Sequence, residues 1–277
     1  GRGCASAPTD HRPSRHGDTV VVTQAYYVQD GEHFHPTDIV TGPWDPDLSH
    51  AGPPAALLLH AVTSSITGMG VTRASFEIPR GIPKVPYTVH LEDIRPGRKV
   101  RLVSAALRAP DDSTLMTANV WLIRESDNGL PSADPYPLTL PPPEECQEFS
   151  IDFGGVGYMD GVDIRAAAGA PFRGGPAAIW IRRTIPLIEG VETDPYTDCG
   201  LFGDLGNGIS AIEPLQQLIA INTDLTLYLA RRPIGEWIAM ESLTISQGLG
   251  LGMTDSLVYD ASGFVGKANQ SIFFDRL

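Results

Sequence analysis

The two halves of the chain share one order of predicted secondary structure. In each half, a helical segment lies between an early strand and several later strands in which apolar and polar residues alternate. In the first half, the strands cover residues 19–27, 74–79, 87–95, 99–108 and 114–124. In the second half, they cover residues 161–167, 177–185, 223–230, 236–246, 249–259 and 264–274. This order predicts an α+β fold with two tandem repeats, each a long antiparallel sheet wrapped round a central helix.

The helix of the first half is predicted from the apolar run at residues 55–62. Its apolar side chains point in nearly every direction, which indicates a buried helix. Pro53 and Pro54 suit its first turn, where a missing backbone N–H costs nothing. Gly68 and Gly70 are expected to end it.

The helix of the second half is expected within residues 194–218, where Gly203, Gly206 and Gly208 each weaken a helix by about 1 kcal/mol. Two short motifs align the halves. His50-Ala51-Gly52-Pro53 stands opposite Asp204-Leu205-Gly206-Asn207, and Ala118-Asn119 stands opposite Ala268-Asn269 in the last hairpin. A duplicated unit is therefore expected.

A proline-rich segment separates the two repeats. Residues 126–150 contain six prolines that cannot donate the hydrogen bonds of a helix or central strand, and they are predicted to be a linker. The expected organisation is a flexible N-terminal arm at 1–18, a first repeat at 19–125, this linker at 126–150, and a second repeat at 151–277 that carries the candidate site.

The acidic composition narrows the choice of partners. A net charge of −13 argues against binding to nucleic acid, whose partners usually carry clustered Lys and Arg. An anionic ligand would need a local basic group, and three are candidates: Arg95, Arg98, Lys99 and Arg101; Arg182 and Arg183; Arg231 and Arg232. The alternative is that these charges are ordinary solvated strand ends.

Cysteine usage and hydropathy predict a cytoplasmic protein. Cys4, Cys146 and Cys199 are far apart and lack metal-ligand spacing, so neither disulfides nor a metal site are expected. No apolar run approaches the roughly 18 residues of a membrane helix, and no signal peptide is evident. No cofactor motif is found, and no membrane association is expected.

The repeats resemble the double hotdog of the acyl-CoA thioesterase II family over roughly residues 20–277. In the first half, the resemblance lies in Gly42-Pro43-Trp44-Asp45 and in the stretch from His50 to Leu58. In the second half, it lies in Gly203-Asp204-Leu205-Gly206-Asn207-Gly208, Ile221-Asn222-Thr223-Asp224-Leu225-Thr226, Arg232-Pro233, Glu236-Trp237 and Asn269-Gln270-Ser271. The resemblance implies hydrolysis of fatty acyl-CoA to free acid and CoA, with acyl-CoA as the substrate.

Members of that family use an Asp, a Thr or Ser, and a Gln to hold and polarise the attacking water. Matched motif by motif, these positions fall on Asp204, Asn222 and Gln270. Asn222 departs from the pattern, because an amide can position a water but cannot act as a base. Thr223 next to it carries a hydroxyl, but the alternation of a strand turns it to the other face.

Four further residues are expected to bind the substrate. Gly206 and Asn207 follow Asp204, and their backbone amides are candidates for binding the oxyanion that develops on the thioester. His50 and Gly52 lie at the equivalent place in the first repeat. Val120 stands where the second half has Gln270, so the first half is expected to shape the acyl pocket rather than perform chemistry.

Each site residue also has a structural interpretation. Asp204 could cap a helix by accepting a hydrogen bond from the amide of Asn207. Gln270 could face water on a strand, as glutamine usually does. Asn222 could be an ordinary turn residue.

Two other functions remain open at this stage. The first is a non-catalytic hotdog protein that binds acyl-CoA or an acyl carrier. The second, an enoyl-CoA hydratase, needs an Asp and a His placed together, and no His follows His90, so a second-half site lacks one. A homodimer or higher homo-oligomer is also possible, since an exposed sheet edge favours pairing.

Overall fold

The structure is a computed structural model that describes residues 25–151, 155–214 and 217–276. The expected arm at 1–18 and residues 19–24 of the first expected strand lie outside the described residues. The described chain starts just before a hairpin of β1 (Tyr27–Asp30) and β2 (His33–Pro36). No helix among the described residues is long and apolar enough to cross a membrane.

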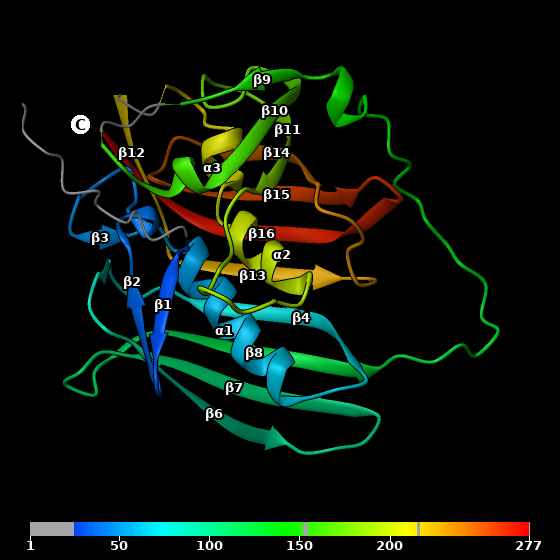
Figure 1. Ribbon diagram of the computed structural model, residues 1–277. Coiled ribbons are helices and arrows are strands. Elements are labelled where there is room, and N and C mark those ends of the chain that lie inside the picture. The colour runs from blue at the N-terminus through cyan, green and yellow to red at the C-terminus, as the bar shows by residue number, and fades with distance from the viewer. Residues whose placement is uncertain (1–24, 152–154, 215–216, 277) are drawn as a thin grey trace, which may run out of the picture.

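One large sheet runs through both halves of the described chain (Figure 1). The first half contributes β4 (Met69–Glu77), β6 (Thr88–Arg95), β7 (Val100–Arg108) and β8 (Thr114–Arg124). The second half contributes β9 (Gln147–Phe149), β10 (Val162–Gly169), β11 (Ala177–Arg183), β12 (Leu218–Asn222), β13 (Asp224–Leu229), β14 (Ile238–Ser246), β15 (Leu251–Asp260) and β16 (Gly263–Arg276). The strand order of this 12-stranded sheet is β6-β7-β8-β4-β13-β16-β15-β14-β11-β10-β9, with β12 also paired to β16.

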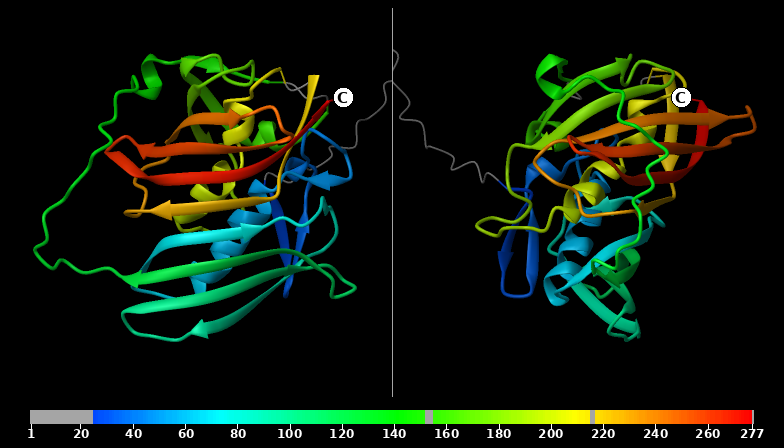
Figure 2. Two further views of the ribbon diagram at one scale, coloured as in Figure 1. Left: turned by 180° about the vertical axis from the view of Figure 1, so that it is seen from behind. Right: turned by 90° about the vertical axis from the view of Figure 1, so that its right-hand side faces the viewer.

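The two halves meet where β4 pairs with β13. These strands are antiparallel, with Ala74 opposite Leu227 and Phe76 opposite Leu225. The four side chains are buried, so the seam between the halves belongs to the common core. Figure 2 shows the sheet from behind as a continuous curved surface with the helices on its inner side.

Three helices fill the concave side of the sheet. They are α1 (Gly52–Ser65), α2 (Tyr196–Gly203) and the single turn α3 (Gly206–Ile209). Pro53 and Pro54 occupy the first turn of α1, as expected. Its apolar residues Ala55, Ala56, Leu57, Leu58 and Leu59 are fully buried. This agrees with the prediction of a helix that is apolar on all sides.

The helices α1 and α2 lie side by side across the middle of the sheet (Figure 1). Their contact is close at the start of α1. A Cβ atom on Gly52 would lie 2.2 Å from the carbonyl oxygen of Leu201 in α2, so only glycine fits there. This approach brings the beginning of α1 next to the end of α2.

Most strands lie where the sequence pattern places them. The main differences are β12, which precedes the strand expected at 223–230, and the small pairs β1–β2 and β3 (Leu48–Ser49)–β5 (Ile82–Pro83), which were not predicted. The helix expected within 194–218 is broken into α2 and α3, with Asp204 and Leu205 between them. Gly203 is the last residue of α2 and Gly206 is the first residue of α3, so two of the glycines expected to weaken the helix flank the break.

The segment predicted as a linker follows β8 and crosses the outside of the molecule (Figure 1). Its last part contains a short 3₁₀ turn, Pro143–Glu145, and the edge strand β9, which pairs with β10. Trp180 donates a hydrogen bond of 2.7 Å to the carbonyl of Pro141, which fixes this part of the segment to the second half. The expected boundaries of the repeats stay a prediction.

Candidate functional site

Asp204 occupies the break between α2 and α3. It is the residue that ends α2, and it is only 6% exposed. Its Oδ1 accepts a hydrogen bond of 2.6 Å from Nδ2 of Asn222, at the end of β12, and a longer one of 3.3 Å from Nε2 of Gln270 on β16. Two amide side chains therefore hold one carboxylate oxygen, leaving Oδ2 for another partner.

Gln270 links Asp204 to the start of α3. Its Nε2 also donates to the main-chain oxygen of Asp204 at 3.1 Å, and its Oε1 accepts from the N–H of Asn207 at 3.1 Å. A Cβ atom on Gly206 would lie 2.9 Å from this Oε1, so glycine lets α3 approach the amide closely. Both ends of Gln270 are thus held by the protein.

His50 reaches the same carboxylate from the first half. Its Nδ1 lies 3.1 Å from Oδ2 of Asp204, and its side chain is only 12% exposed. The ring stacks on Tyr158, with centroids 4.3 Å apart and planes inclined by 15°. The hydroxyl of Tyr158 donates to the carbonyl of Leu201 at 2.8 Å, which fixes the stacking partner in place.

The nitrogen Nδ1 of His50 faces two groups that demand opposite protonation states. The N–H of Gly52 points at it from 3.1 Å, which favours a bare Nδ1, whereas the carboxylate of Asp204 favours a proton on it. The contact with the charged carboxylate is the stronger of the two, so the proton is placed on Nδ1 and Nε2 is the bare nitrogen. Burial lowers the pKa of His50 from its ordinary value near 6.5, and the charge of Asp204 raises it in part. The imidazole is therefore neutral near pH 7 and able to accept a proton.

A group of mostly buried hydroxyl side chains lies beside Gln270 and was not predicted from the sequence. Ser210 contacts Thr244 at 2.8 Å, and Thr244 contacts Thr254 at 2.9 Å. Thr254 is opposite Gln270 in the register of β15 and β16. On the next row, Ser242 and Ser256 are 2.8 Å apart. Ser and Thr two residues apart on both β14 and β15 are the sequence signal that could have revealed this polar inner face.

The structure brings the expected residues into one cluster. Asp204, Asn222 and Gln270 are in direct contact, and Gly52, Gly206 and Asn207 border them. His50 was expected to bind substrate at the equivalent place in the first repeat, and the structure instead brings it into direct contact with Asp204. The roles of these residues stay predictions.

Two structural interpretations of the site residues are wrong. Asp204 does not cap a helix through Asn207, because that amide donates to Gln270. Gln270 does not face water, because it is 3% exposed. The amide of Asn207, expected as an oxyanion donor, is likewise already engaged by Gln270. A hydratase site in the second half was expected to lack its histidine, because no His follows His90. His50 of the first half nevertheless contacts Asp204, so that expectation is wrong.

Comparison with protein families gives two matches that follow one another along the chain. The model described as the acyl-CoA thioesterase N-terminal domain matches residues 40–123, and the one described as the acyl-CoA thioesterase C-terminal domain matches residues 138–274. A comparison with curated protein sequences gives no match.

Solved structures share the fold at low sequence identity. A candidate thioesterase II from Thermobifida fusca is 16% identical with a TM-score of 0.72, and the alignment covers 91% of this chain and 96% of that one. Acyl-CoA thioesterase II TesB2 from Mycobacterium marinum is 17% identical with a TM-score of 0.62, and the alignment covers 82% of this chain and 91% of that one. A protein of unknown function with a hot dog fold from Alicyclobacillus acidocaldarius is 14% identical with a TM-score of 0.67, and the alignment covers 92% of this chain and 97% of that one. The predicted double hotdog fold is confirmed.

Proposed function

This chain belongs to the acyl-CoA thioesterase family, and we propose that it hydrolyses the thioester of a fatty acyl-CoA to a free acid and CoA. The observation that carries the proposal is the buried contact between Asp204 and His50, with Asn222 and Gln270 holding the carboxylate. A carboxylate beside a neutral imidazole is an arrangement that activates water for attack on an acyl carbon.

In the proposed reaction, the ring nitrogen Nε2 of His50 takes a proton from a water molecule while the water oxygen bonds to the thioester carbon. Asp204 stabilises the imidazolium that forms, through the contact of its Oδ2 with Nδ1. The carbon–sulfur bond then breaks, and the proton passes from His50 to the departing CoA thiolate. One water is consumed, and one acid and one thiol are formed.

Asn222 is proposed to position rather than to act as a base. Its amide nitrogen carries two N–H groups. One holds Oδ1 of Asp204 at 2.6 Å, and the other can donate to the thioester oxygen as negative charge develops there. Asn222 is half-buried, so it lies at the edge of the cluster where a substrate can reach it. In this scheme, the hydroxyl found in the family pattern is not required, because His50 supplies the base.

A hydratase is the second candidate, favoured by the same contact. An Asp and a His placed together can also add water across the double bond of a 2-enoyl-CoA, with the hydroxyl bonding to C3 and a proton to C2. Such an enzyme would consume 2-enoyl-CoA without releasing a thiol. The two reactions are therefore separated by their products.

Thiol release, followed with a chromogenic thiol reagent over short to long acyl-CoAs, tests the proposal. Asp204→Asn and Gln270→Ala should each lower kcat/KM, the former by roughly 10²- to 10⁴-fold as expected for disrupting acid–base catalysis. Asp224→Asn is the matched control, because among the described residues that carboxylate accepts one hydrogen bond, from the N–H of Ser271, which an amide oxygen can replace.

Three outcomes are informative. Turnover that Asp204→Asn removes and Asp224→Asn keeps supports hydrolysis at this cluster. No thiol release at any chain length, with acyl-CoA still bound, identifies a protein that holds acyl groups without cleaving them. Loss of 2-enoyl-CoA without thiol release identifies the hydratase instead.

A further inference from the structure

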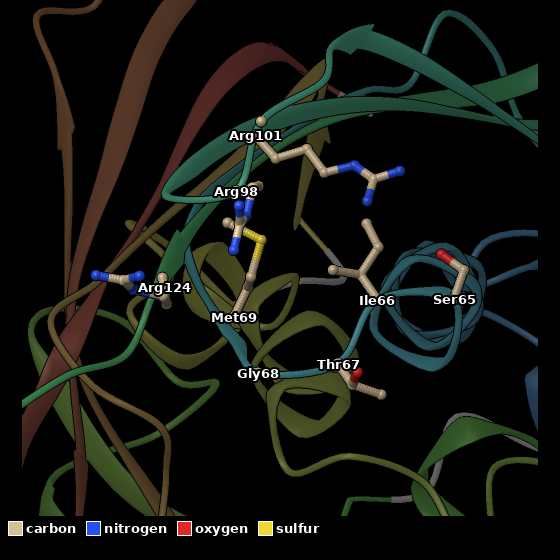
Figure 3. A pocket seen from close by; sticks show the side chains of 9 residues that line it. Ser65, Ile66, Thr67, Gly68, Met69, Arg98, Arg101 and Arg124 are labelled. Carbon is tan, nitrogen blue, oxygen red and sulfur yellow. The ribbon is translucent and has the colours of Figure 1, made fainter.

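A pocket of about 560 Å³ lies at the far end of α1 from Asp204. Its floor contains Ile66 and Met69, both 8% exposed, where α1 ends and β4 begins. Arg98 and Arg101 extend over it, and Arg124 borders it with its guanidinium turned outward (Figure 3). The pocket is wide open to solvent.

The backbone of the sheet fixes these arginines around the pocket. Arg98 lies in the turn between β6 and β7, and Arg101 is the second residue of β7. The N–H of Arg124, at the end of β8, donates to the carbonyl of Lys99 at 2.9 Å, and Arg124 is opposite Met69 in the register of β4 and β8. In Figure 3, Arg98 lies next to Met69, and Arg101 extends over Ile66.

Among the described residues, two arginines of this pocket, Arg98 and Arg124, have no acidic partner, whereas the arginines of the other two candidate groups are paired with carboxylates. Arg182 pairs with Asp163, Arg183 with Asp198, Arg231 with Asp260, and Arg232 with Asp194. At the pocket, Arg101 pairs with Asp93. Within the described part of the chain, Arg98 and Arg124 have no carboxylate within 4.0 Å, and the pocket lining contains no acidic residue. In a chain of net charge −13, this is a local concentration of unpaired positive charge.

We infer that this arginine pocket binds the phosphate groups of a nucleotide. A guanidinium matches the geometry of a phosphate and forms two parallel hydrogen bonds with it. The apolar floor of Ile66 and Met69 suits the flat face of a base, and arginine side chains also stack on such rings. The inference concerns a second place on the molecule, and it rests on the proposed function only where the nucleotide is that of acyl-CoA.

Two sources can supply such a nucleotide. The 14 residues of α1 span about 21 Å at 1.5 Å per residue, and this separates the pocket from His50 and Asp204. The nucleotide end of CoA is joined to the thioester by a long flexible arm, so one acyl-CoA could occupy both places. A free nucleotide could equally occupy the pocket alone. The phosphate chemistry is the same in both cases.

Equilibrium binding of adenosine 3′,5′-bisphosphate and of ATP, measured by titration calorimetry, tests the pocket without any reaction. The doubly substituted Arg98→Glu/Arg124→Glu protein should bind at least about tenfold more weakly, since two charge-assisted contacts become repulsive. Both side chains are exposed, so the fold should persist. Arg80→Glu is the control, because Arg80 is also exposed and follows the opposite end of β4.

The outcome of this titration decides the inference. Weakened binding in the double variant and unchanged binding in Arg80→Glu support it. Equal binding in the wild type and the double variant overturns it, as does absence of binding in the wild type. Weakening by Arg80→Glu instead would place the nucleotide at the other end of the sheet and would also overturn it.

Steady-state kinetics with acyl-CoA and with the matching acyl-pantetheine then separates the sources. If the nucleotide of CoA occupies the pocket, the double variant should raise KM for acyl-CoA and leave KM for acyl-pantetheine unchanged. If a free nucleotide is the ligand, both KM values should stay the same while nucleotide binding is weakened. Failure of the proposed hydrolysis would leave the binding result standing.

Discussion

Replacing His50 by Gln is the sharpest test of the proposed chemistry. The imidazole Nδ1 is 3.1 Å from Oδ2 of Asp204, and no other described histidine pairs with that carboxylate. An amide cannot take a proton from water at neutral pH, so the substitution should remove the base while keeping a polar side chain. The expected loss in kcat/KM is roughly 10²- to 10⁴-fold, or about 3 to 5 kcal/mol at 1.36 kcal/mol per tenfold.

His60 provides the matched control for this substitution. It lies on α1, which begins two residues after His50, and burial lowers its pKa, as it does for His50. Its ring contacts only Ser64 at 3.3 Å among the hydrogen bonds of the described chain. His60→Gln should therefore leave kcat/KM within about threefold of the wild type, as is usual for a surface substitution with a small energetic effect.

The pH dependence gives a second readout. Burial lowers the pKa of His50 below its ordinary value near 6.5, so the neutral base is present above that pH. The rate should be level between about pH 7 and 8 and should fall as pH drops through the lowered pKa. His50→Gln should lose this acid limb.

A folded His50→Gln protein that keeps the wild-type rate and the wild-type acid limb would refute the role of His50 as the base. Circular dichroism and a thermal unfolding curve establish the folded state. In that case Asp204 would be the direct base, and the contact with His50 would only be structural. A loss of rate in His60→Gln of the same size would show that α1 tolerates no polar change, and would remove the specificity of the result.

Two further predictions concern the scaffold. Gly52→Ala should lower the free energy of unfolding by about 1–3 kcal/mol, because its Cβ would lie 2.2 Å from the carbonyl oxygen of Leu201; an unchanged urea unfolding curve would contradict this close approach. Burial alone would raise the pKa of Asp260, but hydrogen bonds from Arg231 and from two backbone N–H groups lower it overall. Its stabilising effect is thus complete above the unfolded pKa near 3.9 and is lost as pH falls through the lower folded pKa, so Asp260→Asn should flatten the loss of stability as pH falls below about 4.

The long strands were predictable because their signal is local. Alternation of apolar and polar residues marks a strand with one buried face, and β7, β8, β14, β15 and β16 all carry it. The strand β12 was missed because its burial comes from pairing with β16, far along the chain, rather than from its own sequence. The break between α2 and α3 was visible only as an excess of glycine.

The site was only partly predictable. Asp204, Asn222 and Gln270 were found by resemblance to family motifs, and the structure places them in contact. The position of His50 beside them depends on α1 lying against α2 across the seam of the two halves, a contact between residues more than a hundred positions apart. No spacing within one half contains that information.

The contact between His50 and Asp204 has a consequence for symmetry. Each residue stands two positions before the start of a helix, α1 or α3, so the two occupy matching places in the repeats. In an assembly of two identical repeats, the same side chain would stand on both sides of this contact, and two carboxylates about 3 Å apart cannot both be ionised. Joining the repeats in one chain lets the two places diverge, so that an acid meets a base. As a consequence, one chain forms one such pair, and neither repeat can form it alone.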